Sequence, residues 1–186
     1  MADRQKKLEA ADKHFNVGKS LSWDKDDFES AKIELRKALQ IRESIYGMFH
    51  IDTSKCYYEI GRAYYAEKKY NESLVMYRKA LRIRVALFGK FHTETKNVDH
   101  CLRLTVQAKG LYNAKDINEA MDAIYDVLNF EIKGDTFRKA GRNAEAQVEY
   151  LKAAAVEEFH FGRDGEILGE LSRKAGIKAP PPPGGR

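Results

Sequence analysis

Two histidines in matching surroundings are the first candidates for chemistry in this chain. His50 lies in the stretch GMFHIDT, residues 47–53, and His92 lies in GKFHTET, residues 89–95. A pair of imidazole rings could ligate a metal or transfer protons. Neither histidine has a nucleophile or a carboxylate at a known motif spacing. We therefore interpret both as turn residues whose rings bond to a nearby backbone group.

The two cysteines give no stronger chemical signal. Cys56 and Cys101 are far apart and belong to no Cys-x-x-Cys or mixed Cys/His pattern, so the sequence predicts neither a disulfide framework nor a zinc site. His100, beside Cys101, is likewise not interpreted as a ligand or a catalytic base. The chain also lacks the Gly-x-Ser-x-Gly and His-Glu-x-x-His motifs and glycine-rich phosphate loops. We expect no enzyme activity, no metal and no cofactor.

The repeated turn belongs to a longer internal repeat. Its two copies are 89 − 47 = 42 residues apart. The same shift maps the run Ala38, Leu39, Ile41 and Arg42 onto the run Ala80, Leu81, Ile83 and Arg84. A recurring segment of this length is typical of proteins that stack copies of one small unit. The turn therefore connects consecutive units, and Gly47 and Gly89 are expected to end a helix in a conformation with positive φ.

Periodicity indicates that each unit is a pair of helices. One face of the first helix carries Tyr57, Ile60, Gly61 and Tyr64, and one face of the second carries Ser73, Leu74, Tyr77, Ala80, Leu81 and Ile83. Asn71 is expected to cap the second helix. Small side chains at Gly61 and Ser73 allow two antiparallel helices to cross closely, and tyrosine rings fill the space around the crossing.

These residues resemble the tetratricopeptide repeat. Its usual pattern is Trp-x-x-Leu-Gly-x-x-Tyr followed by Ala-x-x-x-Phe, and here Tyr57, Ser73 and Tyr77 stand in place of the Trp, Ala and Phe. The longer spacing is similar to the repeats of kinesin light chains. There, an Ala-Leu-x-Ile-Arg-Glu helix end meets a Leu-Gly-x-x-His turn, as in residues 38–50 here, although Ile51 and Thr93 replace the proline of that family.

The resemblance implies an all-α fold, a right-handed superhelical α-solenoid of antiparallel helix pairs. We expect one domain over residues 1–178, with units at about 12–46, 53–88, 101–129 and 127–160. The last two units are weaker matches, and the short spacing between them predicts a nearly direct connection with irregular geometry. An amphipathic stretch at about 164–176 is expected to cap the stack.

A solenoid of this kind binds partners along the first helix of each pair, and the resemblance implies which residues line that groove. They are Tyr58, Arg62 and Tyr65 in the second unit, Lys109 and Tyr112 in the third, and Lys13 and Asn16 in the first, where the register is uncertain by one. In this interpretation Arg62 and Lys109 match across units. They would suit an extended or helical peptide with acidic and aromatic or apolar side chains. The alternative, that these charges are only the solvated side of the helices, stays open.

The C-terminal residues 179–186 form a separate tail, APPPPGGR. Four consecutive prolines favour an extended polyproline conformation and exclude helix and strand. Pro180, Pro181, Pro182 and Pro183 could contact an SH3, WW or profilin-type groove. The simpler interpretation is a disordered terminus, because no fixed specificity residue flanks the prolines.

Composition narrows the function further. The net charge is +5, but the basic residues are interspersed with 28 acidic ones. The N-terminal residues lack the apolar core of a signal peptide, so we expect a cytoplasmic protein. Our leading hypothesis is a non-enzymatic scaffold, a subunit of a larger assembly such as a cytoskeletal or motor complex. The alternative is an RNA-binding helical array, although no regular pair of base-reading residues recurs.

Overall fold

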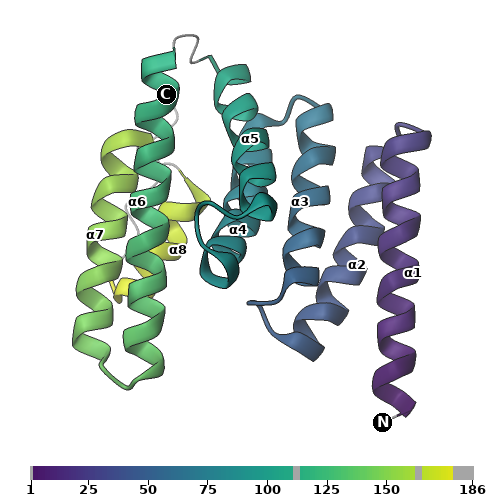
Figure 1. The fold of residues 1–186 in the computed structure, drawn as a ribbon, viewed down its shortest axis with the longest axis horizontal. Coiled ribbons are helices and arrows are strands. Elements are labelled where there is room, and N and C mark those ends of the chain that lie inside the picture. Colours follow the sequence, from purple (N-terminus) through teal and green to yellow (C-terminus); the bar gives the residue numbers. More distant parts are fainter. Residues whose placement is uncertain (1, 111–113, 162–164, 178–186) are drawn as a thin grey trace, which may run out of the picture. The chain divides into compact units, whose positions relative to one another are not determined.

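The structure is a computed structural model that describes residues 2–110, 114–161 and 165–177. The described residues form eight α-helices and no strand, which confirms the all-helical prediction (Figure 1). The helices are α1 (Ala2–Asp24), α2 (Phe28–Tyr46), α3 (Ile51–Ala66), α4 (Tyr70–Phe88), α5 (Thr93–Ala108), α6 (Ala114–Lys139), α7 (Asn143–Phe161) and α8 (Glu166–Ala175).

The helices group into two compact units. Residues 1–111 hold α1 to α5, and residues 112–186 hold α6 to α8. In the first unit α1 pairs with α2 and α3 pairs with α4, while α2 also packs on α3 and α4 on α5. In the second unit α7 packs on both α6 and α8. A continuous solenoid over residues 1–178 stays a prediction.

Each helix pair crosses at a glycine. A Cβ atom on Gly18 would lie 2.7 Å from Leu35 Cγ, and one on Gly61 would lie 3.0 Å from Tyr77 Cδ1. The Ser73 hydroxyl, fully buried, donates a hydrogen bond of 2.8 Å to the Gly61 carbonyl oxygen. The crossing of α3 and α4 therefore needs a residue without a side chain, Gly61, on α3 and a small polar residue, Ser73, on α4. The Asn71 cap was wrong, because α4 begins at Tyr70 and Lys69, its N-cap residue, makes no side-chain capping bond.

The repeated turn is built from its glycine, threonine and histidine. Gly47 has φ 79° and ψ −179°, a backbone region open essentially to glycine alone. Its carbonyl oxygen accepts a bond of 3.1 Å from the Thr53 hydroxyl. His50 Nδ1 accepts a bond of 3.2 Å from the Asp52 amide, so the imidazole caps α3. The second turn repeats these bonds with Gly89, Thr95, His92 and Glu94. The interpretation of both histidines as turn residues is confirmed.

A buried arginine joins each second helix to the turn that follows it. Arg42 donates from Nη1 to the Asp52 carbonyl oxygen at 3.1 Å, and Arg84 donates to that of Glu94 at 2.6 Å. Both arginines are almost fully buried. The Ile-Arg element of the repeat therefore fixes where the next helix starts.

The third and fourth predicted units differ from the structure. Helix α5 begins at Thr93, directly after the turn, and not near residue 101. Helix α6 runs without interruption through residues 127–129, where we expected an irregular connection between two units. The physical reason is that residues 114–133 contain neither glycine nor proline and carry apolar residues at uninterrupted helical spacing.

The second unit has its own close crossing and core. A Cβ atom on Gly134 would lie 2.6 Å from Tyr150 Cε1, so α6 and α7 cross as α3 and α4 do, with the same glycine-to-tyrosine spacing of 150 − 134 = 77 − 61 = 16 residues. Helix α8 buries Leu168, Leu171 and Ala175 against this pair. Its role as a cap stays a prediction. The proline tail lies outside the described residues.

Candidate functional site

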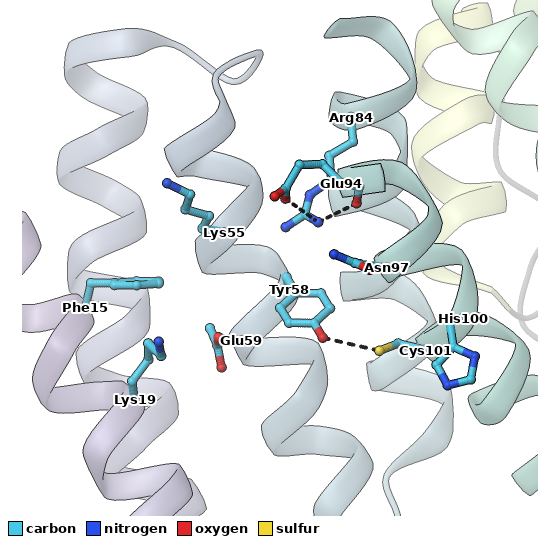
Figure 2. Close-up of a pocket in the computed structure, with 10 residues that line it drawn as sticks. All are labelled: Phe15, Lys19, Lys55, Tyr58, Glu59, Arg84, Glu94, Asn97, His100 and Cys101. Atoms are coloured by element: carbon cyan, nitrogen blue, oxygen red, sulfur yellow. Dashed lines mark hydrogen bonds and ion pairs between the residues drawn. The ribbon is translucent and has the colours of Figure 1, made fainter. Parts of the chain in front are cut away.

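A pocket of about 560 Å³ lies on the first unit among α1, α3, α4 and α5 (Figure 2). Three of its walls are the first helices of successive repeats, which is the face where we expected a groove. The side chains that line the pocket are Phe15, Lys19, Lys55, Tyr58, Glu59, Arg84, Glu94, Asn97, His100 and Cys101.

Equivalent positions on the three helices contribute a ring each. Between α3 and α5 the repeat shift is 42 residues, which matches Tyr58 with His100. Between α1 and α3 the shift is 61 − 18 = 43 residues, because Gly18 and Gly61 occupy the two crossings. Phe15 therefore matches Tyr58. The aromatic or imidazole ring thus recurs in all three walls.

The extra residue in the first repeat lies in the turn between its two helices. The Asp27 amide donates to the Leu21 carbonyl, six residues back, at 3.0 Å. In the second repeat the Lys69 amide donates to the Tyr64 carbonyl, only five residues back, at 2.9 Å. The longer turn shifts the whole register of α1 by one residue relative to α3.

Two rings of the pocket rest against the buried arginines. The Arg42 guanidinium lies 4.4 Å from the centre of the Phe15 ring, and that of Arg84 lies 5.3 Å from the centre of the Tyr58 ring. Cations above ring faces attract the π electrons, more strongly where water is excluded. Arg84 also donates to Ser54 Oγ at 2.8 Å and pairs with Glu94 Oε2 at 3.1 Å. The arginines that fix the turns therefore also position the rings.

Cys56, which is buried, is not arranged as a nucleophile. Burial raises the pKa of the Cys56 thiol to about 11, against the opposing effect of the Arg42 charge. The Tyr58 hydroxyl lies 3.4 Å from Cys101 Sγ, and burial together with this contact raises the pKa of Tyr58 above its usual value. Both groups remain protonated near neutral pH. The pocket therefore offers Tyr58 as a neutral hydroxyl and not as a base.

Arg62 is engaged within the protein. Its guanidinium stacks 3.3 Å from the Trp23 ring centre, donates from Nε to Glu59 Oε2 at 3.2 Å and from Nη2 to Ser22 Oγ at 3.4 Å. The Trp23 indole also donates to Glu59, at 3.2 Å. Residue spacing could not predict this cluster, because Trp23 is distant from Arg62 along the chain. Arg62 is therefore less available to a partner than we expected.

Lys19 occupies the position on α1 that Arg62 occupies on α3. Its ammonium lies 5.9 Å from the centre of the Phe15 ring and, among the residues that the structure describes, has no hydrogen bond or ion pair. Asn97 and His100, on α5, likewise have no hydrogen-bond partner in the described part of the chain. These three side chains are the groups of the pocket that a ligand can engage without breaking an existing bond.

The remaining predicted residues lie away from the pocket. Lys13 and Asn16 are exposed on α1 but do not line it, because the register is shifted by one and Phe15 and Lys19 line it instead. Tyr65 is half-buried, with its ring centre 5.6 Å from that of Tyr70.

The matching of Arg62 with Lys109 was wrong. Because the shift of 42 residues continues through α5, the counterpart of Arg62 is Leu104, and Lys109 is the exposed C-cap residue of that helix. Tyr112 and the prolines Pro180, Pro181, Pro182 and Pro183 lie outside the described residues.

Comparison with protein families adds independent evidence for the repeat. Residues 4–86 match the tetratricopeptide repeat family model. The matched residues take in most of α1 to α4, so the Gly18 and Gly61 crossings and the first turn lie inside the matched segment. The match supports a repeat protein of the tetratricopeptide type. No curated protein matches the chain. The long, kinesin-light-chain-like form of the tetratricopeptide repeat stays a prediction.

The described residues contain neither a candidate metal-binding cluster nor a membrane-spanning helix. No set of three or more histidine, cysteine or acidic side chains in residues 2–110, 114–161 and 165–177 is placed to hold a metal ion. Within the same ranges, every helix is too short or too polar to cross a membrane.

Proposed function

We propose that this protein is a non-enzymatic scaffold that holds a segment of a partner protein in the pocket of its first unit, as a subunit of a larger assembly. The observation that carries the proposal is the pocket itself. Three successive first helices line it, and Lys19, Asn97 and His100 line it without a hydrogen bond or ion pair in the described part of the chain. The tetratricopeptide match supports a protein-binding role in general.

The chemistry of the lining favours an extended or helical peptide with acidic and apolar or aromatic side chains. The Phe15 and Tyr58 rings offer apolar surface, and the Lys19 ammonium offers a charge for a carboxylate. The Asn97 amide both donates and accepts, so it can bond a peptide backbone. RNA is a weaker candidate, because no regular pair of base-reading residues recurs from one repeat to the next.

Chemical cross-linking in native extract, followed by mass spectrometry, tests the proposal. We expect one partner to be cross-linked to α1, α3 and α5, and we expect Tyr58→Ala and Lys19→Glu to remove it. Lys13→Glu is the matched control, because Lys13 is an exposed lysine of the same helix that does not line the pocket.

Cross-links that survive Tyr58→Ala and Lys19→Glu, or that fall only on α2 and α4, would contradict the proposal. Loss of the partner in the Lys13→Glu control as well would point to a general charge effect, which also contradicts a specific pocket.

A further inference from the structure

Helix α7 exposes a stripe of apolar residues on the side away from its core. Val148 is 50% exposed, Leu151 39% and Phe159 84%. Ala144 and Ala155 are exposed too, so the stripe recurs at spacings of 4, 3, 4 and 4 residues, which is one face of a helix. The opposite face holds Ala146, Tyr150 and Ala153, which are buried. In this chain α7 is therefore apolar on two faces.

The internal repeat provides a comparison for this surface. Leu35 and Tyr150 hold the same place at their glycine crossings, which sets the shift from α2 to α7 at 150 − 35 = 115 residues. The five positions of α2 that correspond to the stripe are also all exposed, and they are mostly polar: Glu29, Ile33, Arg36, Gln40 and Ser44. The same outward face that is solvated on α2 is thus apolar on α7. Contiguous apolar patches that are exposed on a protein surface mark interaction sites.

We propose that the stripe on α7 binds the same stripe of a second copy of this chain, with the two helices antiparallel. Residues 144 and 159 lie at equal distances from a point between residues 151 and 152, and so do residues 148 and 155. An antiparallel pair centred there places Phe159 of one copy opposite Ala144 of the other, and Val148 opposite Ala155. Leu151 meets its own copy at the centre. On both sides of the central leucines a larger side chain then opposes an alanine, as close packing requires.

A parallel pair lacks this complementarity. It would place Phe159 against Phe159 and Ala144 against Ala144, which overfills one end of the contact and leaves a gap at the other.

The expected dimer is weak and reversible. A contact between two single helices buries less than the roughly 1,200–2,000 Å² of stable complexes. The contact involves residues of the second unit alone, whereas all residues that line the pocket belong to the first unit. The inference therefore stands or falls separately from the proposed function.

Sedimentation equilibrium of the full chain over a concentration series tests the dimer. We expect a monomer–dimer equilibrium whose dissociation constant rises at least about tenfold in Leu151→Arg, because central contacts dominate such interfaces. Arginine already stands at the corresponding exposed position of α2, as Arg36, so the helix should accept it. Ile33→Arg, on that same α2 face, is the matched control and should leave the equilibrium unchanged. Circular dichroism checks that each variant is folded.

Disulfide trapping tests the orientation. In a Cys101→Ser background, Leu151→Cys should form an intermolecular disulfide on mild oxidation, and Phe159→Cys alone should not. The double variant Ala144→Cys, Phe159→Cys should restore the cross-link. A wild-type chain that stays monomeric at all concentrations, a dimer indifferent to Leu151→Arg, or trapping by Phe159→Cys alone would each overturn the proposal.

Discussion

The guanidinium of Arg84 donates a hydrogen bond of 2.6 Å to the backbone carbonyl oxygen of Glu94, near the start of the next helix. Arg84 is 4% exposed, so this bond forms away from water. Removing the side chain leaves a carbonyl without its charged donor and frees the Tyr58 ring. We predict that Arg84→Ala lowers the free energy of unfolding of the first unit by about 2–3 kcal/mol.

Urea unfolding followed through Trp23 fluorescence measures this effect, because Trp23 is the single tryptophan and reports on the first unit alone. Lys96→Ala, an exposed site on α5, is the control and should change the stability by no more than about 0.5 kcal/mol. Equal losses in both variants would show that the arginine does not join the repeats.

The second prediction concerns Gly134, at the crossing of α6 and α7. Gly134→Ala places a Cβ atom 2.6 Å from the Tyr150 ring, so the helices must separate, and we expect a loss of about 1–3 kcal/mol. In Gly169→Ala, on α8, the new Cβ meets no atom within 4 Å, and we expect a gain of about 0.5–1 kcal/mol from helix propensity. Thermal unfolding by circular dichroism compares the two. The same sign of change in both would contradict the close crossing.

The turn glycine gives a third prediction with a different physical cause. A Cβ on Gly47 would meet no atom within 4 Å, but φ is +79° there. Gly47→Ala should therefore cost about 1–3 kcal/mol through backbone strain alone. Unfolding in urea measures it. If Gly47→Ala proved neutral while Thr53→Val, which removes the bond to the Gly47 carbonyl, was costly, the threonine and not the glycine would hold the turn.

Acid sensitivity of the first unit follows from Glu29. Hydrogen bonds from Lys32 and then from Lys69 lower the pKa of its carboxyl from 4.5 to about 2. A lowered folded-state pKa means that the stabilisation is complete above the unfolded value and is lost as the pH falls from about 4.5 to 2. We predict that Glu29→Gln has a lower free energy of unfolding than wild type at neutral pH. The difference between the two should narrow as the pH falls from about 4.5 to 2.

Urea midpoints recorded across that pH range check the prediction about Glu29. A difference between wild type and Glu29→Gln that stays constant from neutral pH to pH 2 would exclude the ion pairs as its cause.

The sequence predicted the parts of the fold that repeat with a constant period. Gly47, His50 and Thr53 recur at the same spacing as their copies, so one physical interpretation served both turns. The register of α1 relative to α3 was not predictable, because the amino-acid composition does not reveal the extra residue in the turn between α1 and α2. The cluster of Trp23 and Arg62 depends on that register and was missed for the same reason.

The pocket lies among first helices, along which we expected a binding groove, but most of its lining residues differ from the predicted ones, and partner binding there stays a prediction. Tyr58 lines the pocket, as predicted. Arg62 stacks on Trp23, so Lys19 is the pocket cation without an ion pair in the described part of the chain. Burial and pairing of this kind depend on contacts between helices that the spacing of one helix does not encode. For α6, the spacing pointed to two units where unbroken helical propensity favours one long helix.

Site-specific photo-cross-linking tests the central claim most directly. A benzoylphenylalanine in place of Tyr58 lies in the pocket, and one in place of Ile33 lies on the outer face of α2. We predict that position 58, and not position 33, captures a partner protein in native extract, and that Lys19→Glu abolishes the adduct. Capture at position 33 alone, or an adduct at position 58 that Lys19→Glu leaves intact, would contradict a scaffold that holds its partner in this pocket.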